Sequence, residues 1–292
     1  MKKFDIVDNT LLKLGTTTNY NKLRKKTACI ALGWFLIALF LTFGSALAVK
    51  EEHDRDIATC MFFLLIRCYC FHINFISDLT TASILEYIGL KFDQVNEHLQ
   101  NIMRNNEQKI EEAWQSPIMH PYEHRFSKLP LRTINSKNIM WIVIHLHLEL
   151  RKISCGIDSI LGTQMTLRMA WYFVWIAINL RDILYAILSY NYVKYRIMFT
   201  TANFVWFSHN VFKFLLINYM CETVSTKARE TTDLLNRLSY FTCDIEIREI
   251  ISQFSLRTVY TPLRFCGVGL FQFGFKFLHR VCYTYNIIIY YK

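Results

Sequence analysis

Residues 27–49 read TACIALGWFLIALFLTFGSALAV and contain no charged side chain. A helix needs about 20 apolar residues to cross the hydrocarbon core of a bilayer, so this stretch predicts a membrane-spanning helix. Four basic side chains lie within residues 22–26, before the stretch, and four acidic side chains lie within residues 51–56, after it. Because basic flanks remain on the cytoplasmic side, the pattern predicts a cytoplasmic N-terminal segment at residues 1–26.

Four further apolar stretches predict spans of their own, although each also contains ionisable side chains. With the first, they predict an all-α fold: a polytopic transmembrane helix bundle of about five spans, with cytoplasmic helical extensions. Five spans that begin inside the cell place the C-terminus outside. The additional spans cover residues 57–77, 164–188, 197–221 and 265–291.

The distribution of Lys and Arg supports this orientation. The predicted cytoplasmic segments 1–26, 78–163 and 222–264 hold 7, 9 and 6 of these residues, whereas the external loops 50–56 and 189–196 hold 2 each. The net charge of +10 is therefore spread over loops beside the membrane. A nucleic-acid-binding protein would gather its basic side chains on one soluble face, so no nucleic acid partner is expected.

The composition agrees with a protein surrounded by lipid. Hydrophobic residues make up 53% of the 292 residues, and aromatic residues make up 15%. This apolar content exceeds that of ordinary soluble domains and excludes a disordered chain. The lipid bilayer is thus the first partner that the sequence predicts.

The long segment 78–163 is predicted to be helical at both ends. Apolar side chains recur every three or four residues over 85–102 and again over 142–160, which is the period of one helix face. A polar stretch at about residues 105–130 separates the two patterns. Two alternatives remain: an intracellular bundle that packs subunits together, or a helical hairpin that packs on its own chain.

No residue pattern indicates catalysis, a metal site or a cofactor. Cys68, Cys70 and His72 lie two residues apart, as do His145 and His147, so on a helix these side chains point in different directions. Zinc ligands must converge, and these do not. The nine cysteines are an odd number and lie mostly in apolar stretches, which argues against a disulfide framework.

Charged side chains inside the spans are the first candidates for a functional role, because burying them in a membrane is costly. Arg67 lies in the middle of the second span and is able to pair with Asp182 of the third. An unpaired Arg67 would instead face a wet ligand cavity. Aromatic rings in the external halves of the spans suit a small organic ligand, or else they fill the bundle or form an interfacial belt. The ligand-pocket candidates are Phe40, Phe43, Phe63, Arg67, Asp182, Tyr185, Asn203 and Phe207.

Residues 267–271 read GVGLF and residues 284–292 read TYNIIIYYK. This C-terminal sequence resembles that of the insect gustatory receptors, which are related to the insect odorant receptors. The family enters its last helix through a similar Gly-Leu-Phe turn, and that helix ends in Thr-Tyr, five mostly apolar residues and Gln-Phe. Residues 88–99 and 5–20 also resemble family segments in the same order. The five spans here would correspond to spans three to seven of the family, without the first two.

The resemblance implies a multi-pass plasma-membrane protein. Such a protein would be a subunit of a ligand-gated cation channel and would not be an enzyme. Four copies, or a mixture with other gustatory receptors, would surround one pore lined by the last helix. A small tastant molecule would bind in the external half of each subunit. The candidate pore-lining residues are Thr284, Tyr285, Ile288, Tyr291 and Lys292.

The chain departs from the family pattern at its pore helix. Tyr291 and Lys292 replace the expected Gln-Phe, and Lys276, His279 and Arg280 interrupt the apolar helix. Positive rings disfavour cations in a pore. A second hypothesis is therefore a non-conducting membrane interaction subunit, or a degenerate or truncated receptor product. A membrane enzyme is the third hypothesis, and no catalytic spacing of residues supports it.

The predicted topology is testable on cells. An epitope tag within residues 105–137 should be hidden from antibody on intact cells and accessible after permeabilisation, because the flanking charges place that segment in the cytoplasm. A tag within residues 50–56 should be accessible without permeabilisation. Labelling of the 105–137 tag on intact cells would contradict the orientation.

Overall fold

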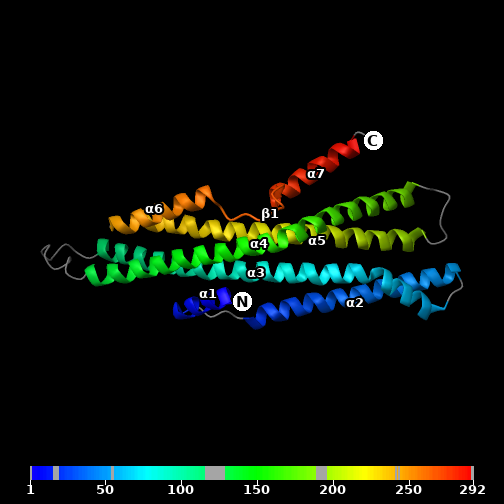
Figure 1. Cartoon of the computed structure of the whole chain (residues 1–292), viewed down its shortest axis with the longest axis horizontal. Helices are drawn as coiled ribbons and strands as arrows, with labels where there is room; N and C mark the ends of the chain where they lie inside the picture. The colour runs from blue at the N-terminus through cyan, green and yellow to red at the C-terminus, as the bar shows by residue number, and fades with distance from the viewer. Residues whose placement is uncertain are drawn as a thin grey trace. The chain divides into compact units, whose positions relative to one another are not determined.

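The computed structural model describes residues 2–15, 20–53, 56–115, 129–188, 196–240, 242 and 244–290. Helices dominate this part of the chain, which confirms the all-α prediction (Figure 1). The elements are α1 (Lys2–Lys13), α2 (Tyr20–His53), α3 (Ile57–Gln115), α4 (Leu129–Leu188), α5 (Arg196–Tyr240), α6 (Ile245–Tyr260), β1 (Cys266–Gly267), β2 (Phe271–Gln272) and α7 (Phe275–Tyr290).

Three of the helices are long enough to take part in two separate compact units. Unit 1 comprises Met1–Thr18, Glu86–Leu161 and Cys221–Cys266. Unit 2 comprises the remaining segments Asn19–Leu85, Gly162–Met220 and Gly267–Lys292. Helices α3, α4 and α5 each contribute residues to both units.

The apolar stripe of α3 forms the centre of unit 1. Ile88, Phe92, Val95 and Leu99 are each at most 1% exposed. Phe92 packs edge-on against His147 of α4, whose ring in turn packs against Phe254 of α6. The stripe is therefore buried within a single chain, which favours the alternative of a helical hairpin packed on its own chain.

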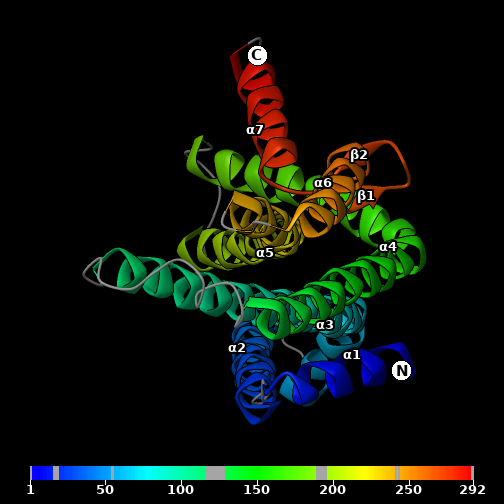
Figure 2. The ribbon, with the colours of Figure 1, turned by 90° about the vertical axis from the view of Figure 1, so that its left-hand side faces the viewer.

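Polar contacts attach α1 and α5 to the same part of α3. The buried Lys91 side chain of α3 forms an ion pair with Asp8 of α1 at 2.6 Å, and Tyr87 donates a hydrogen bond to the same carboxylate. On the α5 side, Thr231 donates to Asn96 at 2.7 Å. Figures 1 and 2 show α1 beside α3, as these contacts require.

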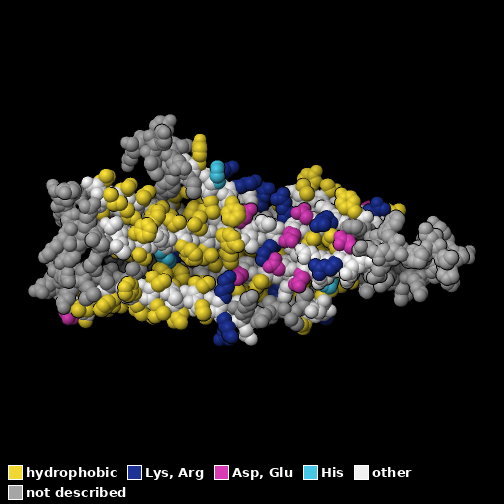
Figure 3. All heavy atoms as spheres, turned by 180° about the vertical axis from the view of Figure 1, so that it is seen from behind, with side chains coloured by type: hydrophobic (Ala, Val, Ile, Leu, Met, Phe, Trp, Pro, Cys, Tyr) yellow, Lys and Arg dark blue, Asp and Glu magenta, His cyan; other side chains and the backbone are white. Residues whose placement is uncertain are grey.

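Unit 2 has a largely apolar exterior. Figure 3 shows broad hydrophobic areas over its helices, whereas charged side chains gather over unit 1. Contiguous exposed apolar side chains are typical of a surface that contacts lipid or another protein. Large apolar side chains that are exposed in unit 2 include Leu36, Phe40, Phe62, Ile76, Leu167, Leu184 and Leu188.

Length and composition qualify one helix among the described residues as a candidate membrane span, Asn138–Leu188, within which the predicted span 164–188 lies. A core helix of a soluble protein can pass the same test, but only 17% of the apolar window of this helix is buried within the chain. All five predicted spans, including 164–188, remain predictions.

The predicted last span differs from the structure at its start. Helix α7 begins at Phe275, whereas the apolar stretch begins at residue 265. A short hairpin of β1 and β2 occupies the residues between. Its turn contains Val268 and Gly269 with φ angles of 52° and 73°, which a helix does not accommodate.

Truncation of the α3 stripe tests the packing of unit 1. We expect Leu99→Ala to lower the free energy of unfolding by about 2–5 kcal/mol, because it removes a fully buried side chain and leaves a cavity. The exposed neighbour Glu97 provides the control, and Glu97→Ala should change the free energy by less than about 0.5 kcal/mol. Thermal melts of the purified protein measure both, and equal melting temperatures would contradict the packing.

Candidate functional site

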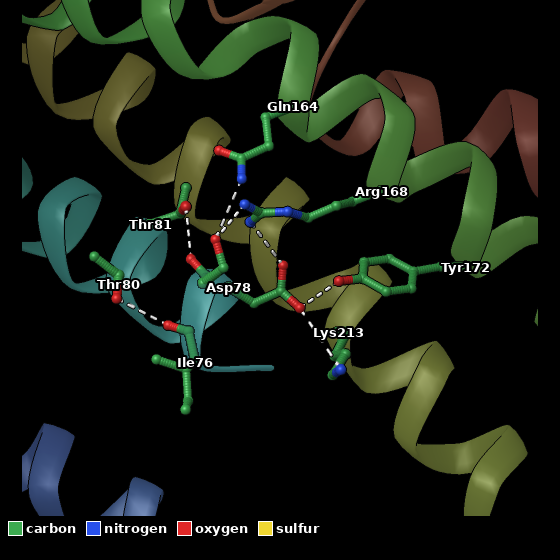
Figure 4. A network of polar contacts seen from close by, with 9 residues as sticks. Ile76, Asp78, Thr80, Thr81, Gln164, Arg168, Tyr172 and Lys213 are labelled. Carbon is green, nitrogen blue, oxygen red and sulfur yellow. Dashed lines mark hydrogen bonds and ion pairs between the residues drawn. The ribbon is translucent and has the colours of Figure 1, made fainter. Parts of the chain in front are cut away.

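A buried ionic network lies inside unit 2, where three helices meet. Asp78 comes from α3, Arg168 and Tyr172 come from α4, and Lys213 comes from α5 (Figure 4). None of these four residues is more than 8% exposed. Polar groups are placed this deeply only where partners compensate for the loss of water.

Both carboxylate oxygens of Asp78 are engaged. Arg168 Nη1 donates a hydrogen bond to Asp78 Oδ1 at 3.1 Å. Tyr172 donates its hydroxyl hydrogen to Asp78 Oδ2, and Lys213 Nζ lies 3.7 Å from the same oxygen. Asp78 is therefore the centre of the network, and the other three side chains converge on it.

The spacing of residues on α4 explains why its polar side chains reach this point together. Gln164, Arg168 and Tyr172 are each four residues apart, so they lie on one face of the helix. Gln164 and Arg168 both donate to the hydroxyl of Ser77, the residue before Asp78. The polar face of α4 formed by Gln164, Arg168 and Tyr172 thus contacts Ser77 and Asp78 of α3.

The network holds two cations for one carboxylate, and aromatic rings surround the second cation. Lys213 Nζ lies 5.8 Å from the centre of the Trp34 ring, 5.5 Å from Phe75 and 5.5 Å from Tyr172. Each cation–π contact contributes about 0.5–2 kcal/mol, more when water is excluded. Trp34 belongs to α2, so the environment of Lys213 involves all four helices α2 to α5.

An aromatic stack continues from Trp34. Its ring stacks on His209 of α5 at 3.8 Å and on Phe75 of α3 at 4.6 Å. His209 lies one helical turn before Lys213, so the two face the same side of α5. The stack and the ionic network therefore form one continuous contact between α2, α3 and α5.

This arrangement is suited to holding helices α3, α4 and α5 together rather than to catalysing a reaction. Every charged group in it already has an opposite charge, a hydrogen-bond partner or aromatic rings around it. Among the described residues, no group of three or more His, Cys, Asp or Glu side chains is placed to hold a metal ion. Removing one member would leave the others buried without their partner, which is strongly destabilising.

The charged residues that the sequence pattern singled out, Arg67 and Asp182, are not members of this network. Asp182 forms its ion pair with the neighbouring Arg181, at 2.7 Å, and the Arg67 side chain lies outside the described part, so their proposed pairing stays a prediction. Asp78 was missed because it follows the predicted span 57–77 by one residue. Arg168 and Lys213 stood out in the sequence only as interruptions of apolar stretches.

Several ligand-pocket candidates lie on the surface of the chain. Phe40, Phe43, Phe63 and Tyr185 are 76%, 48%, 58% and 68% exposed. Exposed rings of this kind fit the alternative of a lipid-facing or interfacial belt. Three further candidates, Asp182, Asn203 and Phe207, are half-buried.

The pore candidates fall on the part of α7 for which little is described. Thr284, Tyr285 and Ile288 belong to the helix, but their side chains lie outside the description, as do Tyr291 and Lys292 altogether. The basic residues that interrupt the helix are described. Lys276, His279 and Arg280 are all exposed, and their spacing places them along one side of α7.

Neutralising the centre of the network tests its importance. We expect Asp78→Asn to lower the free energy of unfolding by about 3–5 kcal/mol, because Arg168 and Lys213 lose their buried counter-charge. Adding Arg168→Gln should recover part of the loss by removing one of the two unpaired cations. The measurement is the melting temperature of purified protein, with Asp182→Asn as the control for a more exposed carboxylate. A melting temperature for Asp78→Asn equal to that of the unmutated chain would contradict the network.

Comparison with known proteins identifies the family. The sequence matches the 7tm chemosensory receptor family over residues 1–287. No protein with a curated description matches it. Among solved structures, the insect olfactory receptor OR5 from Machilis hrabei is similar, with 10% sequence identity and a TM-score of 0.59 over 92% of this chain and 67% of that one.

The two positive findings agree with each other and with the helical fold. At this level of identity the structural likeness shows the fold alone, whereas the family match spans nearly the whole sequence. Membership also accounts for the apolar exterior of unit 2, since the family is one of multi-pass membrane proteins. The chain belongs to the 7tm chemosensory receptor family.

Proposed function

We propose that the chain is a gustatory receptor: a subunit of a ligand-gated cation channel that responds to small tastant molecules at the plasma membrane. The observation that carries the proposal is the family match over residues 1–287. The gustatory branch is favoured by the C-terminal TYNIIIYYK, which resembles the end of gustatory receptors at residues 284–292.

The two units divide the proposed function between them. Unit 2, with its apolar exterior, would lie in the bilayer and hold the ligand in its external half. There the candidate residues are Phe40, Phe43, Phe63, Arg67, Asp182, Tyr185, Asn203 and Phe207. Unit 1, which contains most of the residues predicted to be cytoplasmic, would hold the inner ends of the helices together.

The Asp78 network gives the proposed receptor a rigid element. Separating Asp78 from Arg168 or Lys213 inside the bundle would leave buried charges unpaired, which costs several kcal/mol. A small ligand supplies only a few kcal/mol of differential binding to shift an equilibrium between two states. Helices α3, α4 and α5 are therefore expected to move as one body around Asp78 when a ligand binds, rather than to slide past one another.

The pore is assigned to α7 in an assembly of four subunits, either identical or mixed with other gustatory receptors. If the helix continues through residue 291, Thr284, Ile288 and Tyr291 would share one face and line the conduction path, with Tyr285 beside them. Lys292 would place one positive charge per subunit at the external mouth. Of the exposed basic residues of α7, His279 would then face away from the axis, whereas Arg280 lies four residues before Thr284 and would share its side of the helix.

A non-conducting interaction subunit is the second candidate. The observation that favours it is the sequence Tyr291-Lys292, where the resembling segment of gustatory receptors has Gln-Phe. A ring of lysines raises the electrostatic energy of an entering cation, and salt screens it incompletely in a narrow opening. Such a chain could still assemble with conducting partners.

Restoring the family sequence at the pore mouth distinguishes the two candidates. We expect Tyr291→Gln with Lys292→Phe to increase tastant-evoked cation currents, because the change removes the ring of positive charge. Whole-cell recordings would use cells that express the chain alone or with other gustatory receptors, exposed to sugars and bitter compounds. Surface labelling should show equal amounts of both proteins.

Lys276→Gln is the matched control, since it removes a positive charge from the other end of α7 and should leave the current unchanged. Silence from every variant would favour the interaction subunit. Large cation currents from the unmutated chain, unaltered by the double substitution, would show that Lys292 lies away from the conduction path.

A further inference from the structure

The start of α7 is held by one buried side chain of α5. Asn218 is 0% exposed, and its Oδ1 accepts a hydrogen bond from the backbone N–H of Gly274 at 3.0 Å. Gly274 directly precedes the first residue of α7. The bond therefore joins α5 to the point where the chain leaves the hairpin and enters its last helix.

Gly274 sets the position of the first turn of α7. Its carbonyl oxygen accepts hydrogen bonds from the amides of Phe277 and Leu278, at 3.1 and 3.2 Å, so it occupies the cap position of the helix. Its φ angle of 132° is one that glycine adopts far more readily than other residues. The N–H of this cap residue has no acceptor within α7, and Asn218 supplies one.

The amide nitrogen of Asn218 is also engaged. It donates to the backbone carbonyl of Phe214 at 2.8 Å and lies 3.7 Å from the sulfur of Met169 on α4. The bond to Phe214 fixes the orientation of the side chain on its own helix. Asn218 thus presents its oxygen to Gly274 from a fixed position that also contacts α4.

Aromatic contacts surround this hydrogen bond without fixing its direction. Phe214 of α5 lies 5.8 Å from the Phe277 ring, and Tyr219 lies 6.3 Å from Phe275. Phe271 of β2 stacks on Phe277 at 4.4 Å with an angle of 11° between the rings. Ring contacts tolerate sliding, whereas a hydrogen bond to a backbone amide specifies one position.

Helix α5 also carries Lys213, five residues before Asn218. Lys213 belongs to the network around Asp78, and Asn218 holds α7, so one short stretch of α5 contacts both. Within unit 2, a displacement of this stretch necessarily moves the acceptor of the Gly274 N–H. The geometry thereby connects the rigid ionic network with the entrance to α7.

We propose that Asn218 is a positioning residue that fixes the start of α7 to α5, so that displacement of α5 is transmitted to α7. The consequence for gating rests on the proposed channel function. The attachment itself does not, and it can be measured without any current.

Hydrogen exchange of the full chain in lipid nanodiscs measures the attachment. In the unmutated protein, the Gly274 amide should exchange as slowly as the interior amides of α7, although it lies outside the helix. Asn218→Leu and Asn218→Ala should accelerate exchange at Gly274 and the first turn of α7 by about 5-fold to 30-fold, because the bond to α5 is lost. Fast exchange at Gly274 in the unmutated protein would overturn the proposal even if both variants failed to fold.

Asn210 provides a matched control on the same helix. It is also buried, at 2% exposed, and it donates to the carbonyl of Trp206 four residues earlier, as Asn218 does to Phe214. Asn210→Leu should leave exchange at the start of α7 unchanged. Equal acceleration by Asn210→Leu and Asn218→Leu would show a general loosening of α5 and would overturn the specific role of Asn218.

Recordings from the same variants separate this proposal from the channel function. Asn218→Leu should reduce the maximal tastant-evoked current at equal surface expression, whereas Asn210→Leu should not. Accelerated exchange with no current from any protein, including the unmutated one, would contradict the channel function and leave the positioning role standing. Unchanged exchange in Asn218→Leu would overturn the positioning role, whatever the currents show.

Discussion

The carboxylate of Asp78 is the group on which the arrangement of unit 2 depends. It is the common partner of Arg168, Tyr172 and Lys213, and all four are buried. In a largely apolar bundle, dispersion and burial allow helices to slide or rotate at modest cost, because many apolar faces pack about equally well. Because two buried cations share one carboxylate, few other orientations of the helices would keep both of them paired. The network therefore determines which faces of α3, α4 and α5 pack together. A buried ionic group used in this way specifies an arrangement more than it adds stability.

The parts of this fold that follow from local periodicity could be predicted from the sequence. The uncharged stretch 27–49 lies wholly within helix α2, and the apolar stripe from Ile88 to Leu99 is buried as its three- and four-residue spacing indicated. The entry to α7 could not be predicted from periodicity, because a short apolar run has the same composition in a strand as in a helix. Only the resemblance of residues 267–271 to a Gly-Leu-Phe turn implied a break before the last helix. The expected helix from residue 265 therefore proved to be a hairpin followed by a helix from Phe275.

The ionic partners could not be predicted because they are distant in sequence. Asp78 and Arg168 are 90 residues apart, and nothing in the local pattern indicates that they meet. The same reasoning made Asp182 a candidate partner for Arg67; Asp182 forms an ion pair with the adjacent Arg181, and its pairing with Arg67 stays a prediction. A charge inside an apolar stretch indicates that some partner exists, but the packing of the helices determines which one. The sequence pattern did not single out Asn218, because an uncharged amide does not interrupt an apolar stretch as a charge does. Its role follows only from its hydrogen bond with Gly274.

A density map of the chain in lipid nanodiscs, at a resolution that shows side chains, tests the central claim most directly. The account predicts the Asp78 carboxylate between Arg168 and Lys213, within hydrogen-bonding distance of the Tyr172 hydroxyl and closed off from lipid and water. It also predicts the same contacts with and without a bound tastant, since the helices around Asp78 are expected to move together. Density that places Asp78 against lipid or open solvent, or that separates it from both cations when a ligand binds, would contradict the account.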